Sequence, residues 1–171
     1  DYDYALLAIG AHNMEMPIPH KESNIVSSWD VLNGQEVQGA CVVIGGGLVG
    51  AETAEYLANK GHQVTIVEMM DKIAAGESTT VLPLMMKDFA DHNVKQLVNT
   101  KVDHIENNIV YTANDQIKAD TIINALGSKK NIFDDSSITI PHVCVGDCSG
   151  ERTADIASAI RTAYHAANAI D

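Results

Sequence analysis

The sequence predicts an α/β fold in which a doubly wound parallel sheet carries a small antiparallel meander. Short apolar runs, each typical of a buried strand, alternate with segments of helical periodicity. One of these runs leads through a glycine-rich turn into a helix, in the stretch CVVIGGGLVGAETAEYLANKGHQVTIVE at residues 41–68. Asn-Asn and Asn-Asp turn signals separate three short runs within residues 101–119, which indicates the meander.

The elements before residue 70 follow from apolar patterning and from glycine and proline. An apolar run ending at Gly10 predicts a buried strand, and Pro17 and Pro19 then indicate a loop. In order, we expect a strand at 4–9, a loop, a short helix or turn at 27–34, a strand at 40–44, a helix at 48–60 and a strand at 63–68. The helix has one apolar face, made of Leu48, Ala51, Ala54, Leu57 and Ala58.

The same criteria apply to the rest of the chain. They predict a helix at 80–93, a strand at 94–98, the meander, a strand at 119–127, a loop holding Lys129 and Lys130, a strand at 138–147 and a helix at 154–170. Pro83 fits the first turn of its helix, and Met85 and Met86 are expected to fill the core. The last helix should bury a stripe made of Ile156, Ile160, Ala163 and Ala167.

Composition excludes several classes of partner. Hydrophobic residues make up 46% of the chain and charged residues 20%, as in a globular protein. The net charge of -12 argues against nucleic acid, and no apolar run reaches the roughly 18 residues of a membrane span. The first residues, DYDYALLAIG, lack both an initiating Met and a basic region, so we expect a cut inside a longer chain rather than a signal peptide.

Cysteine and histidine spacing predicts no metal site. Cys41, Cys144 and Cys148 are odd in number and lack CxxC spacing, which favours a reduced, cytoplasmic setting over a disulfide framework or a zinc site. The seven histidines show no ligand spacing. We also find no Tyr-x-x-x-Lys pair and no His–Asp couple placed for proton transfer, so no catalytic residue is predicted and a short-chain dehydrogenase is set aside.

The glycine-rich turn has the spacing of a dinucleotide-binding loop, Gly45-x-Gly47-x-x-Gly50. Gly45 allows a tight turn out of the strand, Gly47 lets a pyrophosphate approach the backbone, and Gly50 lets the helix pack closely. The pyrophosphate would meet the unpaired N–H groups at the helix N-terminus. Alternatively, the glycines serve only close packing of helix and strand.

Glu68 ends the second strand, about 20 residues beyond the loop, where a carboxylate can accept hydrogen bonds from an adenosine ribose. The same carboxylate would repel a 2′-phosphate, and no Arg follows it, so NAD(H) is favoured over NADP(H). Lys72 is a nearby cation that weakens this preference. Glu52, in the first turn of the helix, either complements the helix dipole or contacts the nicotinamide amide or a flavin.

The order of motifs resembles the pyridine nucleotide–disulfide oxidoreductase fold, in which an NAD(P)-binding Rossmann-like domain is inserted into an FAD-binding domain. The motifs are Ala8-Ile9-Gly10-Ala11, the glycine-rich unit, Ala125-Leu126-Gly127-Ser128 and Val145-Gly146-Asp147-Cys148. The sequence of residues 42–74 is similar to that of NADH:flavin oxidoreductases of the 2,4-dienoyl-CoA reductase, enoate reductase and trimethylamine dehydrogenase type.

This resemblance implies roles for further residues. Ala8, Gly10 and Ala11 match a motif beside the FAD, although Ile9 stands where the family commonly has Thr. Gly146 and Asp147 match a Gly-Asp motif whose acid binds the FAD ribityl chain; Asp147 can alternatively cap the following segment. Gly127 matches a glycine that lines the NAD site. The full set of candidate dinucleotide contacts is Gly45, Gly46, Gly47, Leu48, Val49, Gly50, Glu52, Glu68, Lys72 and Gly127.

The resemblance further implies how the chain is organised. Residues 1–37 and 129–171 are expected to be return segments of a partial FAD-type domain, and residues 38–128 the inserted NAD-binding domain. No second GxGxxG precedes residue 40 and no cluster-binding cysteines are present, so the chain is expected to be a C-terminal piece, inactive alone, of an enzyme with FMN and iron–sulfur domains. NADH would reduce FAD, and an activated C=C bond would be reduced in the complete enzyme. The alternative is a non-catalytic module that holds ADP or NAD.

Overall fold

The computed structural model describes residues 2–76, 78, 80–150 and 156–170, and the chain divides into two compact units. The central unit is Glu15–Gly127, and the flanking unit joins Asp1–Met14 to Ser128–Asp171. The central unit begins earlier than the segment 38–128 expected for the NAD-binding domain. It does so because residues 15–37 supply β3 (His20–Lys21) and β4 (Ile25–Ser27) to its sheets.

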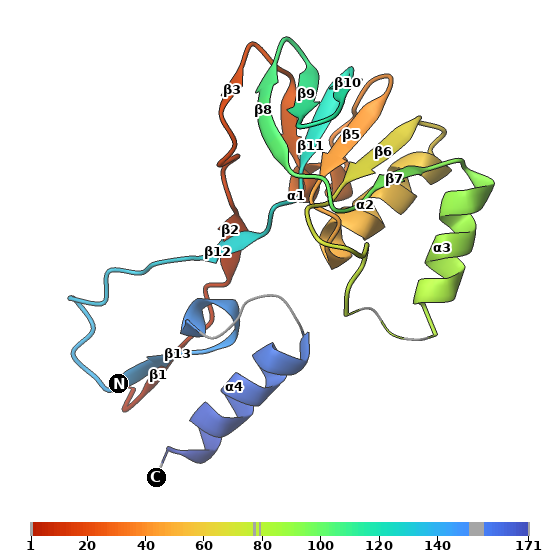
Figure 1. Ribbon diagram of the computed structural model, residues 1–171. Coiled ribbons are helices and arrows are strands. Elements are labelled where there is room, and N and C mark those ends of the chain that lie inside the picture. Colours follow the sequence, from red (N-terminus) through yellow and green to blue (C-terminus); the bar gives the residue numbers. More distant parts are fainter. Residues whose placement is uncertain (1, 77, 79, 151–155, 171) are drawn as a thin grey trace. The chain divides into compact units, whose positions relative to one another are not determined.

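A five-stranded parallel sheet forms the middle of the central unit (Figure 1). Its strands, in spatial order, are β4, β11 (Thr121–Asn124), β5 (Cys41–Ile44), β6 (Val64–Val67) and β7 (Lys95–Leu97). From β5 the chain runs outward through β6 to β7, whereas β11 and β4 lie on the other side of β5. Ligands of such sheets bind at the carboxyl ends of the strands where the order reverses, which here falls between β5 and β11.

Three helices contribute to the core on one face of this sheet. They are α1 (Ser28–Leu32), α2 (Leu48–Asn59) and α3 (Leu82–Asp91). Side chains alternate between the two faces of a strand. In β5, Cys41 and Val43 accordingly pack in a core cluster with Leu57 and Phe89 of the helices.

The opposite face of the parallel sheet packs against the predicted meander. Its strands are β8 (Val102–Glu106), β9 (Ile109–Thr112) and β10 (Gln116–Lys118), paired antiparallel, and β3 adds a parallel strand beside β8. Val42 and Ile122 of the parallel sheet share a second core cluster with Ile105 and Val110 of the meander. The central unit is therefore three layers, and the predicted α/β class is confirmed.

Some details of the central unit differ from the sequence prediction. The segment with Pro17 and Pro19 was expected to be a loop, but it contains β3, which pairs with β8. A hydrogen bond from the N–H of Ile105 to the carbonyl of Pro19 adjoins this pairing. Leu48 was assigned to the buried face of its helix, yet it is 37% exposed because it starts the helix beside the glycine turn.

The flanking unit contains two short two-stranded sheets. One pairs β1 (Ala5–Leu7) in parallel with β13 (His142–Cys144), and the other pairs β2 (Ala11–Asn13) antiparallel with β12 (Ser128–Lys130). Lys129 and Lys130 therefore lie on a strand, not in the predicted loop. The strand predicted as buried at 4–9 is also wrong in part, since Leu6 is 41% exposed on a sheet of only two strands.

The apolar stripe predicted on the last helix, α4 (Ile156–Asn168), is not its packed face. Ile156 and Ile160 are 80% and 64% exposed. The packed face instead carries the buried Ser158 and also Thr162, whose hydroxyl accepts a hydrogen bond of 2.8 Å from the N–H of Gly146. Helical periodicity identifies an apolar stripe, but it does not identify which stripe has a neighbour to pack against.

Two adjacent serines at the start of α1 make opposite contributions to stability. The Ser27 hydroxyl caps α1 by accepting from the N–H of Asp30 at 3.0 Å, and it donates to the Asp30 carboxylate. The Ser28 hydroxyl is buried and has no hydrogen-bond partner among the described residues. We expect Ser27→Ala to lower the free energy of unfolding by about 1 kcal/mol. Ser28→Ala should be neutral or stabilising, because it removes an unpaired buried hydroxyl; urea denaturation of both variants compares them.

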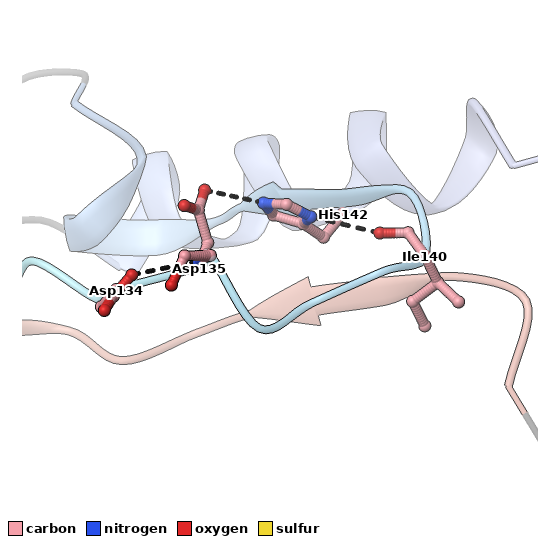
Figure 2. Close-up of polar contacts among 5 residues, drawn as sticks. Asp134, Asp135, Ile140 and His142 are labelled. Atoms are coloured by element: carbon pink, nitrogen blue, oxygen red, sulfur yellow. Dashed lines mark hydrogen bonds and ion pairs between the residues drawn. The ribbon is translucent and has the colours of Figure 1, made fainter.

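A histidine–carboxylate pair tightens the loop before β13 (Figure 2). The Nε2 of His142 lies 2.9 Å from the Asp135 carboxylate, and its Nδ1 lies 3.2 Å from the carbonyl of Ile140. The hydrogen bond to Asp135, followed by that to Ile140, raises the pKa of His142 above its ordinary 6.5. The neighbouring Asp134 carboxylate bonds instead to Ser136, which lowers the pKa of Asp134.

This pair predicts a local dependence on pH. Because the pKa of His142 is raised in the folded protein, the contribution of the His142–Asp135 pair to the free energy of unfolding is complete below pH 6.5. This contribution is lost as the pH rises through the higher pKa of the folded state. We expect an NMR titration to show the raised pKa of His142, and Asp135→Asn to return it toward 6.5. Asp134→Asn is the matched control, and an equal effect of the two substitutions would contradict the assignment.

Candidate functional site

The three motif glycines have different surroundings in the turn between β5 and α2. Gly45 has a φ of +100°, and a Cβ added to it would lie 2.5 Å from the carbonyl oxygen of Ala125. A Cβ on Gly50 would lie 1.9 Å from the carbonyl oxygen of Gly45. At Gly47, the N-cap of α2, a Cβ would meet nothing within 4 Å. Close packing therefore accounts for Gly45 and Gly50, whereas Gly47 leaves open space in front of the helix N-terminus.

The Glu68 carboxylate joins this turn to the end of β6. The side chain is 9% exposed. One of its oxygens accepts from the N–H of Gly46 at 2.6 Å and the other from the N–H of Met70 at 2.7 Å. Glu68 is thus a structural clamp between two loops. A carboxylate has about four lone-pair positions, so each oxygen retains capacity for a hydroxyl donor.

A cavity of about 450 Å³ opens at this edge of the parallel sheet. The ends of β5 and β6, the segment after β11 and the connection from β7 to β8 form its walls. The lining residues are Pro17, Ile18, Ile44, Gly45, Gly47, Val67, Glu68, Met69, Thr100, Lys101, Val102, Ala125, Leu126 and Gly127. Its volume lies in the usual range for ligand pockets, and its place is the one that the strand order indicates.

The structure brings together four of the sequence-derived candidates. Gly45, Gly47, Glu68 and Gly127 all line the cavity. The remaining six candidates do not line it: Gly46, Leu48, Val49, Gly50, Glu52 and Lys72. Gly46 contributes indirectly, because its N–H holds the Glu68 carboxylate.

Sequence reasoning missed the residues contributed by the connection from β7 to β8. Lys101 is an exposed cation that lines the cavity, next to the half-buried Thr100. The available signal was positional, since a segment that follows a parallel strand lies at the ligand-binding edge of the sheet. Lys101, rather than Lys72, is therefore the lysine that lines the cavity.

Glu55 of α2 has other acidic residues in its surroundings. The pKa of Glu55 is raised, first by burial and then by a hydrogen bond to Asp88 of α3, with a smaller repulsion from Glu52. Glu52 itself is exposed. Glu52 was expected in the first turn of the helix, but the first turn of α2 (from Leu48) holds no acidic residue, and Glu52 does not line the cavity.

The flavin-side candidates lie at the ends of two paired strands in the flanking unit. Because β1 and β13 are parallel, Ala8 and Gly146 follow them at the same edge. The N–H of Val145 donates to the carbonyl of Leu7 at 2.9 Å, which fixes this arrangement. Asp147 follows in the first turn of the 3-10 helix η1 (Gly146–Ser149) and is half-buried.

Gly10 and Ala11 lie at the turn from β1 into β2. Gly10 has a φ of +69°, which favours glycine. Asn131 holds this turn: its side-chain amide donates to the carbonyl of Ile9 at 2.7 Å, and its backbone N–H donates to the carbonyl of Gly10. Asn131 is a positioning residue that no sequence motif indicated.

The sequence also predicted no membrane-spanning segment and no metal site. In the described part of the chain, no helix is long and apolar enough to cross a membrane. Within the same residues, no group of three or more His, Cys, Asp or Glu side chains is arranged to hold a metal ion.

Comparisons with known proteins agree with the fold. Residues 1–143 match the family described as pyridine nucleotide-disulphide oxidoreductase. The chain is 44% identical, over 98% of its length, to a bilirubin reductase of Mediterraneibacter gnavus, and 50% identical, over 42% of its length, to an NADH oxidase of Thermoanaerobacter brockii. A 2-naphthoyl-CoA reductase structure covers 95% of the chain with a TM-score of 0.80 and 25% identity.

The chain spans only part of each of these proteins: 28% of the bilirubin reductase, 12% of the NADH oxidase and 26% of the naphthoyl-CoA reductase chain. The homologues are oxidoreductases, and the family uses FAD and NAD(P). With a match over residues 1–143, the chain belongs to the pyridine nucleotide-disulphide oxidoreductase family.

Proposed function

We propose that the chain is the NADH-binding part of a flavin-dependent oxidoreductase, in which hydride passes from NADH to FAD and an activated C=C bond is reduced. The observation that carries this assignment is the open space at Gly47, where the N-terminus of α2 adjoins the cavity that Glu68 lines. A cavity of about 450 Å³ at a switch point of a parallel sheet is a suitable place for a dinucleotide.

The residues present fit the dinucleotide. Gly47 gives a pyrophosphate access to the unpaired N–H groups at the start of α2, where the helix dipole also favours an anion. Glu68 is anchored by two backbone N–H groups and can still accept from ribose hydroxyls. Its negative charge disfavours a 2′-phosphate, which supports NADH over NADPH, while Lys101 opposes that preference. NADH supplies the hydride; the protein's contribution is to bind and orient it.

The flanking unit fits an FAD-type domain whose remaining parts lie elsewhere in the polypeptide. Asp147 follows a strand end beside Ala8, where a carboxylate can accept from the hydroxyls of a ribityl chain. The exposed Ile156 and Ile160 on α4 suit a helix that further polypeptide covers. We therefore assign the flanking unit, Asp1–Met14 with Ser128–Asp171, to FAD-type return segments and the central unit, Glu15–Gly127, to the NAD-binding insertion, which moves the first boundary from residue 37 to residue 14.

The substrate class rests on the relatives. The bilirubin reductase and the 2-naphthoyl-CoA reductase are both named as reductases of organic substrates. This supports an NADH:flavin oxidoreductase related to the 2,4-dienoyl-CoA and enoate reductases, with FMN and an iron–sulfur cluster held by other domains. Three free thiols suit a cytoplasmic enzyme, and the net charge of -12 suits one that binds no nucleic acid.

A thermal-shift titration with NADH, NADPH and ADP tests the assignment. A ligand present at 100 times its dissociation constant adds about 2.7 kcal/mol of stability. At equal concentrations, NADH should raise the melting temperature more than NADPH. Equal or reversed shifts would refute the preference for NADH, and no shift with any nucleotide would refute the site. If ADP matched NADH, the non-catalytic nucleotide module would be the better description.

A further inference from the structure

Two adjacent methionines directly follow Glu68 at the end of β6, and both are open to solvent. Met69 is 64% exposed and Met70 is 58% exposed. The other four methionines of the chain are half-buried or buried: Met14, Met16, Met85 and Met86. A small oxidant in solution can therefore reach the sulfur atoms of Met69 and Met70 more easily than the rest.

The two exposed methionines differ in their relation to the cavity. Met69 lines the cavity of about 450 Å³, and Met70 does not. The wall that Met69 shares is largely aliphatic, with Val67, Val102 and Leu126 among its residues. A change in polarity at Met69 would therefore alter a surface that is otherwise suited to the apolar parts of a ligand.

The backbone around Met69 is held in place on both sides. The carbonyl of Glu68 accepts from the N–H of Thr100 at 2.9 Å, and the carbonyl of Met70 accepts from the N–H of Asn99 at 2.8 Å. The N–H of Met70 also donates to the Glu68 carboxylate. These bonds tie the segment to the connection from β7 to β8 without using the side chain of Met69. A chemical change at the Met69 sulfur can thus modify the cavity wall while the loop keeps its conformation.

We propose that Met69 is a peroxide-sensitive site whose oxidation to methionine sulfoxide weakens nucleotide binding in the cavity. A lone pair of the Met69 sulfur attacks one oxygen of hydrogen peroxide, so that an S–O bond forms and the O–O bond breaks. The second oxygen leaves as water after proton transfer. The sulfur loses two electrons and the peroxide gains two, so atoms and electrons balance.

Oxidation replaces an apolar thioether with a polar sulfoxide. The adjacent Glu68 carboxylate accepts two hydrogen bonds and offers the sulfoxide oxygen no donor. A nucleotide that covered this oxygen would remove its water without replacing the hydrogen bonds, and we expect affinity to fall about 5-fold or more. This step rests on the proposed function, since it requires that the nucleotide occupies this cavity.

Peptide mass spectrometry tests where oxidation occurs. The whole protein is treated with hydrogen peroxide and digested with trypsin, and fragment ions locate each added oxygen. Met69 and Met70 share the peptide 61–72, whereas Met85 lies in the peptide 73–87. We expect oxidation of Met69 and Met70 under conditions that leave Met85 unmodified, because Met85 is 2% exposed. A Met69 that reacts no faster than Met85 would overturn the proposal.

Two substitutions then separate the effect of Met69 from that of Met70. The affinity for NADH is measured by calorimetric titration before peroxide treatment and again after the peroxide has been removed. It should fall about 5-fold or more in the unsubstituted protein and by the same factor in Met70→Leu. In Met69→Leu the affinity should be the same before and after treatment. Each comparison is made within one variant, and the exchange of Met for Leu conserves volume.

The possible outcomes distinguish this inference from the proposed function. If the untreated protein does not bind NADH, the proposed function fails and this inference fails with it. If the untreated protein binds NADH but oxidation of Met69 leaves the affinity unchanged, only this inference is overturned. An equal loss of affinity in Met69→Leu and in the unsubstituted protein would also overturn it, because the sensitive residue would then lie elsewhere.

Discussion

Gly50→Ala should destabilise the central unit, and Gly47→Ala, three positions earlier, should leave it folded. A Cβ at position 50 would lie 1.9 Å from the backbone carbonyl oxygen of Gly45, which cannot rotate away as a flexible side chain could. Forcing the helix away from the strand should cost about 3 kcal/mol or more, at the upper end of overpacking effects. Urea denaturation measures the loss, and a Gly50→Ala variant of unchanged stability would refute the close approach of α2 to β5.

Gly47→Ala, the counterpart of Gly50→Ala, tests nucleotide binding rather than stability. Gly47 has a φ of -64°, which alanine adopts, and its Cβ would point into open space, so the cost in stability should stay within about 1 kcal/mol. The added methyl would occupy the space through which a pyrophosphate reaches the backbone. Loss of charge-assisted hydrogen bonds worth about 1.5–3 kcal/mol corresponds to roughly 10- to 100-fold weaker binding of NADH. Calorimetric titration measures this, and unaltered affinity would exclude the turn as the pyrophosphate site.

The central unit was predictable because its signals are local. An apolar run, a glycine turn, a helix and a second run define β5, α2 and β6, and a parallel arrangement then follows from the length of the crossover. The carboxylate of Glu68 could be placed at the ligand edge because it ends a strand. Its two backbone hydrogen bonds could not be predicted, because they depend on how the loop at Met70 folds back toward Gly46.

The remaining features depend on contacts between segments distant in sequence. The strand at Lys129 and Lys130 exists because it pairs with residues 11–13, and neither segment has strand patterning of its own. The bonds from Asn131 to the turn at Gly10 likewise join two segments far apart in sequence, which no local motif encodes. Periodicity describes what one element can bury, whereas these features depend on the neighbour that it meets.

Replacing Glu68 with alanine should also cause a large loss of stability, and this changes how its effect on nucleotide preference is to be measured. The substitution removes the acceptor of two N–H groups, those of Gly46 and Met70. Two charge-assisted hydrogen bonds contribute about 1.5–3 kcal/mol each, so we expect a loss of about 3 kcal/mol or more. Asp71→Ala makes the same change of charge at an exposed position nearby, and it should leave urea denaturation almost unchanged.

Glu68→Gln separates the clamp from the charge. Its carbonyl oxygen can still accept from one N–H, but its amide nitrogen would face the other donor, so the loss of stability should be smaller than for alanine. Removing the negative charge should bring the affinities for NADPH and NADH closer together, because a 2′-phosphate is no longer repelled. The preference is measured as the ratio of the affinities for NADPH and NADH within one variant. This ratio does not depend on how much stability the variant has lost. If the variant is destabilised but the ratio is unchanged, Glu68 acts only as a structural clamp. Another residue would then determine nucleotide preference, and Lys101 is a cation that lines the cavity.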